Sequence, residues 1–159
     1  LGDDVFTKGK IGEEKKKLFI MTMNAFKLII DIHKVKVYMA CATSAMREAA
    51  NGQAIVKRVE KKLGLKIHII SGEKESQLIL KSVLNYFPQS GNYINIDVGG
   101  GSTEMTIIRN HVPIISKSFP VGTVRLMDGM VDPKIWKDME KWVLKNTKGI
   151  QDLAALGTG

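Results

Sequence analysis

Three consecutive glycines, Gly99, Gly100 and Gly101, precede Ser102 and Thr103 and lie between two runs of strand-forming residues, in YINIDVGGGSTEMTII. Glycine gives access to positive φ and leaves backbone N–H groups uncovered. Together with nearby hydroxyls, such N–H groups form a concave set of donors that suits an anion such as phosphate. We therefore predict a phosphate-binding turn here, with an ordinary hairpin turn as the alternative.

Two other glycine-rich phosphate loops are excluded by the residues around the turn. A Walker loop requires Gly-Lys followed by Ser or Thr, which is absent here. A dinucleotide-binding loop opens a helix, whereas the residues that follow this turn, TEMTII, favour a strand. The pattern therefore predicts a turn between two strands.

Asp97 and Glu104 flank the turn symmetrically. If the turn runs from Gly99 to Ser102, Asp97 faces Glu104 on one side of the hairpin, with Cβ atoms about 5 Å apart. A divalent cation would relieve the repulsion between two such carboxylates, and Mg²⁺ commonly binds one or two carboxylates together with water and substrate phosphates. We predict a Mg²⁺ site, or a site for another divalent cation, at this pair. A register shift of one residue would separate the two acids.

The elements that must position these residues alternate along the chain. Apolar periodicity, turn residues and strand formers predict helices over 13–33, 53–63, 72–87 and 134–146, and strands over 34–43, 66–71, 93–98, 103–109 and 113–122, with a further strand in 149–159 that runs into a second glycine turn. This order predicts an α/β protein with mixed sheets and flanking helices. Pro88 and the polar residues after it indicate a boundary, so we expect one domain over 1–89 and another over 90–159.

Composition narrows the classes of partner. The net charge of +8 and the pI near 9.6 favour an anionic partner. With 6% aromatic residues the chain lacks the stacking platforms of single-strand binders, so we expect no nucleic-acid partner. The longest apolar stretch is interrupted by Asn24 and Lys27, which indicates an amphipathic helix and no membrane partner. The single cysteine, Cys41, lies in an apolar run and is expected to be buried, and a chain without disulfides fits the cytoplasm.

Several motifs in this order resemble the exopolyphosphatase / guanosine-pentaphosphate phosphohydrolase (Ppx/GppA) family. They are ATSAMREAANG at 42–52, IISGEKES at 69–76, IDVGGGSTE around the turn, and the final LGTG. The resemblance implies the fold of the actin-like ATPase (ribonuclease H-like) superfamily. Ser76 stands where that family usually has Ala, and its first phosphate loop is absent. The chain is therefore expected to be a fragment that is inactive by itself.

By resemblance, the parent protein would release terminal phosphate from inorganic polyphosphate or from guanosine pentaphosphate. Glu75 matches the family's base on the attacking water, Arg47 its phosphate-binding arginine, and Asp97 and Glu104 its cation-associated acids. From the residues alone, Glu75 is better explained as an ordinary first-turn acid that favours the helix dipole. Arg47 is equally well explained as a surface arginine that pairs with Glu48 or Glu60. A kinase or ATPase of the same superfamily and a non-catalytic phosphate sensor stay open as alternatives, and a homodimer is left open.

Overall fold

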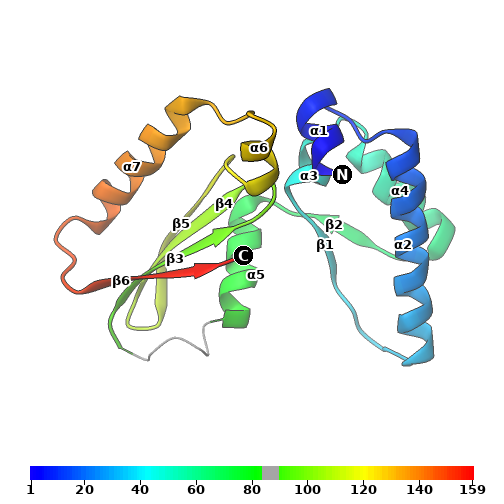
Figure 1. The fold of residues 1–159 in the computed structure, drawn as a ribbon. Coiled ribbons are helices and arrows are strands. Elements are labelled where there is room, and N and C mark those ends of the chain that lie inside the picture. Colours follow the sequence, from blue (N-terminus) through cyan, green and yellow to red (C-terminus); the bar gives the residue numbers. More distant parts are fainter. Residues whose placement is uncertain (84–89) are drawn as a thin grey trace. The chain divides into compact units, whose positions relative to one another are not determined.

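The computed structural model describes residues 1–83 and 90–159. It divides into two compact units, Leu1–Ile70 and Ser71–Gly159, which are described separately below (Figure 1). Both units combine strands with helices, which confirms the α/β class. The predicted domain boundary between 89 and 90 stays a prediction, and Pro88 and the end of the predicted helix 72–87 lie outside the described residues.

The structure describes every residue of the first unit, and these residues form four helices and two short strands. These elements are α1 (Gly2–Lys8), α2 (Glu13–Ile32), β1 (Ala40–Ala42), α3 (Ser44–Glu48), α4 (Gly52–Leu63) and β2 (Ile67–Ile69). The two strands pair in parallel. The helix predicted over 53–63 is confirmed as α4, which is separated from α3 by residues 49–51, and Gly64 ends α4 in the left-handed conformation with φ 69°.

The packing of this unit differs from the sequence-based expectation in two places. The predicted strand 34–43 is reduced to Ala40–Ala42, because its neighbour β2 pairs with three residues only. Cys41 is exposed, not buried as predicted, since a two-stranded sheet covers its strands incompletely. The short helix α1 was not predicted; its Val5 packs with Ile11 in the core of the unit.

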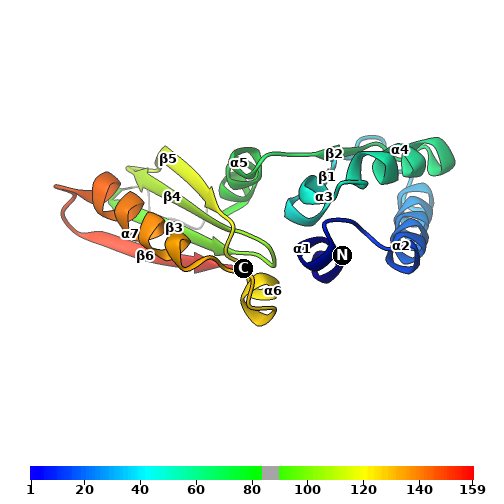
Figure 2. The same cartoon turned by 90° about the horizontal axis from the view of Figure 1, so that it is seen from above.

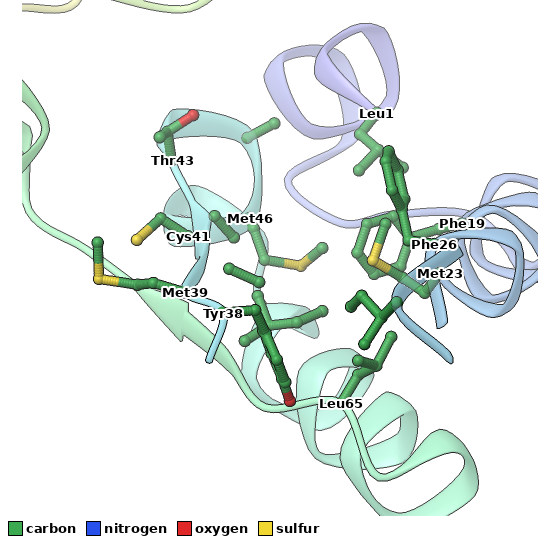
Figure 3. A pocket seen from close by; sticks show the side chains of 15 residues that line it. Leu1, Phe19, Met23, Phe26, Tyr38, Met39, Cys41, Thr43, Met46 and Leu65 are labelled. Carbon is green, nitrogen blue, oxygen red and sulfur yellow. The ribbon is translucent and has the colours of Figure 1, made fainter. Parts of the chain in front are cut away.

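The apolar side of α2 is also less covered than its periodicity predicts. No residue of α2 is buried, and Leu18, Met21 and Ile29 are more than half exposed. A cavity of about 470 Å³ lies beside this helix, lined by apolar side chains that include Phe19, Met23 and Met46 (Figure 3). Across the described residues, no helix is both long enough and apolar enough to span a membrane.

The second unit is built on a four-stranded sheet. Its elements are α5 (Gly72–Val83), β3 (Asn92–Val98), β4 (Thr103–Arg109), β5 (Val112–Phe119), α6 (Thr123–Met127), α7 (Pro133–Thr147) and β6 (Leu153–Thr158). The strand order is β5-β4-β3-β6. The strand β3 is antiparallel to β4 and parallel to β6, so the sheet is mixed as predicted.

Helices α7 and α5 cover opposite faces of this sheet (Figure 2). The α7 face holds the main core, where Phe119 meets Trp142 edge to face at 6.0 Å between ring centroids. On the other face, Leu80 of α5 packs with Ile108. Because successive strand residues point to opposite faces, Asp97 and Glu104 share the α5 face with Ile108.

Candidate functional site

The turn between β3 and β4 has the register that the sequence predicted. Val98 pairs with Thr103, and Asp97 pairs with Glu104. The Gly99 N–H donates to the Ser102 carbonyl at 2.9 Å and closes the hairpin. The glycine loop, defined as Gly99–Ser102, is therefore a tight turn between antiparallel strands.

The carbonyls of the three loop glycines are held by the segment that begins α6. The Gly99 and Gly100 carbonyls accept hydrogen bonds from the N–H groups of Thr123 at 3.0 Å and Val124 at 2.9 Å. The Gly101 carbonyl accepts from Nε of Arg125 at 2.6 Å. One short segment thus fixes three successive peptide planes of the loop.

This arrangement sets the direction of the loop's N–H groups. In a trans peptide the C=O and the following N–H point in opposite directions. Since the three carbonyls point to the start of α6, the N–H groups of Gly100, Gly101 and Ser102 point away from it. Within the described residues, these three N–H groups donate to no protein acceptor. Three adjacent donors with a common direction form a site for an anion.

The loop glycines do not adopt positive φ, contrary to the prediction. None of Gly99, Gly100 and Gly101 is among the residues with positive φ. The tightest contact comes from Gly122, where a Cβ would lie 2.4 Å from the Gly100 carbonyl carbon and oxygen. Thr103, 3% exposed, adds a hydrogen bond from its hydroxyl to the Val121 carbonyl at 2.6 Å.

The two acids beside the loop each accept a hydrogen bond from a neighbouring strand. The Thr158 hydroxyl donates to Oδ1 of Asp97 at 2.7 Å, and the Ser118 hydroxyl donates to Oε1 of Glu104 at 2.6 Å. Asp97 is half-buried, whereas Glu104 is 2% exposed. Sequence reasoning did not identify Thr158 and Ser118, although LGTG was noted as a motif.

The acid pair fits a hydrated cation better than an all-protein metal site. Across residues 1–83 and 90–159, no group of three or more His, Cys, Asp or Glu side chains could hold a metal ion. A carboxylate that accepts one hydroxyl keeps acceptor capacity on its oxygens. Mg²⁺ is commonly held by one or two carboxylates and completes its shell with water and phosphate. Asp97 and Glu104 match this mode of binding.

The final LGTG motif lies beside the glycine loop because β6 runs parallel to β3. Thr158 pairs with Asp97 in this ladder. A Cβ on Gly159 would lie 2.5 Å from the Val98 carbonyl oxygen, and its φ is 146°. The final LGTG therefore reaches the end of β3 from which the glycine loop emerges.

Glu75 lies in the first turn of α5, as predicted. It is half-buried, and its N–H donates to the Ser71 carbonyl at 2.9 Å. The helix begins beside Glu104, because a Cβ on Gly72 would lie 2.5 Å from Cβ of Ser118 and 3.7 Å from Oε1 of Glu104. The second unit therefore brings the start of the Glu75 helix and the glycine hairpin into one packed group.

Arg47 belongs to the first unit and lies in α3. Its Nη1 donates to the Ile70 carbonyl at 2.7 Å. The predicted cleft shared by Arg47 and the glycine loop would involve both units, so it stays a prediction.

Comparisons with known proteins point to one family. The profile of the Ppx/GppA phosphatase family matches residues 1–152. The chain is 35% identical over 121 residues to exopolyphosphatase 1 of Mycobacterium leprae, which covers 76% of this chain and 36% of that protein. It is 37% identical over 87 residues to a guanosine-5'-triphosphate,3'-diphosphate pyrophosphatase of Pseudoalteromonas translucida, covering 55% of this chain and 18% of that protein. The chain thus spans roughly a third or less of these two relatives.

Solved structures show the same fold. An exopolyphosphatase from Cytophaga hutchinsonii matches with a TM-score of 0.81 and 29% identity, over 94% of this chain and 53% of that one. The Ppx/GppA family member from Aquifex aeolicus matches with a TM-score of 0.73 and 26% identity, over 99% of this chain and 54% of that one.

Proposed function

The chain belongs to the Ppx/GppA phosphatase family, and from this premise we propose that its parent protein hydrolyses the terminal phosphoanhydride bond of inorganic polyphosphate or guanosine pentaphosphate. The observation that carries the proposal is the set of three N–H groups, on Gly100, Gly101 and Ser102, that share one direction and lack protein acceptors in the described chain. Such donors suit the oxygens of a terminal phosphate.

Charge neutralisation is the main demand of phosphoryl transfer. The N–H groups of the glycine loop would bind the terminal phosphate, with Ser102 and Thr103 completing the loop. Arg47 would add a planar guanidinium, which matches phosphate oxygens with two parallel hydrogen bonds. A divalent cation held by Asp97 and Glu104 would neutralise further phosphate charge.

Glu75 would act on the attacking water. The water oxygen forms a bond to the terminal phosphorus while the bond from phosphorus to the bridging oxygen breaks. The bridging oxygen leaves with the shortened phosphate chain, the proton of the water passes to the Glu75 carboxylate and then to solvent, and the terminal group is released as orthophosphate. The N-terminal end of α5 favours the charged form of this carboxylate, so orientation of the water is a large part of its role.

Location and assembly belong to the same proposal. A cytoplasmic enzyme fits a chain with one cysteine and no disulfide partner for it. A homodimer is the assembly that we would test first, by sedimentation of the full-length protein. Neither the loop nor the acid pair requires a nucleic acid or a membrane as partner.

Phosphate release from the full-length protein tests the function directly. The assay supplies Mg²⁺ and compares long-chain polyphosphate with guanosine pentaphosphate, and we expect orthophosphate from at least one of them. A protein that binds these compounds without releasing phosphate would be a sensor. Transfer of the phosphate to an acceptor other than water would make it a kinase.

A further inference from the structure

The segment Val121–Arg125 lies behind the glycine loop and belongs to none of the motifs recognised in the sequence. From its contacts, we propose that Arg125 is a positioning residue of the glycine loop. Its Nε–H holds the Gly101 carbonyl and thereby directs the Ser102 N–H toward the bound phosphate. This inference rests on the proposed function, since it assigns a role at the same phosphate site.

Arg125 differs from the other residues that hold the loop. The Gly99 and Gly100 carbonyls are held by backbone N–H groups, which nearly any residue would supply. The Gly101 carbonyl is held by a side chain, so this contact depends on the residue type. The 2.6 Å distance is short for N–H···O and fits a bond from a charged donor.

The third peptide plane can also rotate when its carbonyl has no hydrogen-bond partner. Gly101 has no Cβ, so the peptide between Gly101 and Ser102 has few steric barriers to rotation. A flip of this peptide would turn the Gly101 carbonyl toward the phosphate, where two negative oxygens would repel each other. The bond from Arg125 opposes that flip, and donors that are oriented before the substrate arrives need no reorganisation during the reaction.

Arg125 also carries a positive charge, and two substitutions separate charge from orientation. In Arg125→Gln, the side-chain amide places an N–H donor at the same position along the side chain as Nε, without the charge. In Arg125→Met, both the donor and the charge are lost at similar length. If Arg125 acts by orienting the loop, Arg125→Gln should keep much of the phosphate affinity that Arg125→Met loses.

The experiment measures the affinity of the full-length protein for methylenediphosphonate, a phosphoanhydride mimic that is not hydrolysed, by calorimetry with Mg²⁺. We expect Arg125→Met to weaken binding about tenfold or more, as for the loss of a hydrogen bond that orders a charged contact. Arg125→Gln should stay within about threefold of the wild type. The matched control is Arg109→Met, at the exposed far end of β4, which should bind as the wild type does.

A second variant protects the test against misfolding of Arg125→Met. Thr123→Pro removes the N–H that holds the Gly99 carbonyl, at the first position of α6, where proline is favoured. Gly122 before it is extended, with φ −152° and ψ 166°, as a residue before proline prefers. We expect weaker binding, and the melting temperature is measured beside it because proline removes a hydrogen-bonded N–H.

The outcomes separate this inference from the proposed function. Equal affinities of Arg125→Gln and Arg125→Met for the mimic would overturn the positioning role of Arg125, even in a protein that releases phosphate. The same holds if neither Arg125→Met nor Thr123→Pro loses affinity. A wild type that binds the mimic but releases no phosphate would overturn the proposed hydrolase function without affecting the positioning role of Arg125. A wild type that neither binds the mimic nor releases phosphate would overturn both, and one that releases phosphate without binding the mimic would overturn the role of Arg125 alone.

Discussion

Gly72, the first residue of α5, lies so close to Ser118 of β5 that a Cβ at Gly72 would be 2.5 Å from Cβ of Ser118. Ser118 in turn donates a hydrogen bond to Glu104. The start of the helix that carries Glu75 is therefore packed on a side chain that contacts the acid pair. The position of Glu75 thus depends on the absence of a side chain three residues earlier.

Gly72→Ala is expected to lower both turnover and stability. The added methyl group overpacks the contact with Ser118, which typically costs about 1–3 kcal/mol in the free energy of unfolding. Urea denaturation and phosphate release measure the two effects. Adding Ser118→Gly to Gly72→Ala should restore part of the turnover and part of the stability. A double-mutant cycle in which the two substitutions show no coupling would contradict the contact. Gly157→Ala, where a Cβ would meet nothing within 4 Å, is the control.

Glu75→Gln should reduce turnover by about 10²- to 10⁴-fold, the usual contribution of a positioned general base. Its affinity for methylenediphosphonate should change little, because the amide keeps the size of the side chain. Glu73→Gln is the matched control, since Glu73 is an exposed acid in the same first turn. Near wild-type turnover of Glu75→Gln would remove Glu75 from the mechanism.

Asp97→Asn should raise the Mg²⁺ concentration for half-maximal activity by at least about tenfold, the lower end of what even an outer partner of a metal ligand contributes. Thr158→Val should produce a smaller rise in the same direction, because the Thr158 hydroxyl holds the Asp97 carboxylate. Asp152→Asn, an exposed acid just before β6, is the control. An unchanged Mg²⁺ requirement in Asp97→Asn would contradict the cation site.

Arg47→Ala should weaken binding of polyphosphate more than it lowers turnover at saturation, because a fixed positive charge mainly contributes binding energy. The substitution also removes the hydrogen bond to the Ile70 carbonyl, so the melting temperature must be compared. Arg58→Ala, which removes an exposed arginine of α4, controls for net charge. Equal polyphosphate affinity of the Arg47 variant and the wild type would exclude the role.

The first unit should lose stability in acid as the Asp4 carboxylate becomes protonated. The hydrogen bond from the Gly12 N–H, at 3.0 Å, lowers the pKa of Asp4 below its ordinary value of 3.8, and Lys8 and Lys15 add to this. Since the folded-state pKa is the lower one, the stabilisation is present above pH 3.8 and is lost as the pH falls through the folded-state pKa. Urea denaturation by circular dichroism at decreasing pH should show this loss. Asp4→Asn should reduce the pH dependence, and Asp31→Asn should not.

The hairpin of the candidate site was predictable because its signals are local. A turn of four residues between two strands fixes the register, and the register places Asp97 opposite Glu104. The helix predicted over 134–146 also has a local start: the Asp132 carboxylate accepts from the Lys134 N–H at 2.8 Å, and Pro133 is the first residue of α7. Local chemistry of this kind is visible in a single sequence.

The supports of the site were not predictable, because they come from residues far along the chain. Arg125 holds a carbonyl 24 positions earlier, and Thr158 holds a carboxylate 61 positions earlier. The prediction that Cys41 is buried was wrong for the same reason. The apolar residues around it predict a covered strand, but burial depends on packing partners that a local pattern does not specify. The glycines of the loop were explained by positive φ, which none of them adopts, whereas the tight approach at Gly100 comes from Gly122 across the chain.

The exposed position of Cys41 makes it a natural labelling site for energy-transfer measurements. It is the single cysteine of the chain, so a maleimide dye would attach at one site in the first unit without any substitution. Both tryptophans, Trp136 and Trp142, lie on α7 of the second unit. Energy transfer from these tryptophans to a dye on Cys41 would therefore follow the separation of the two units when a polyphosphate is added.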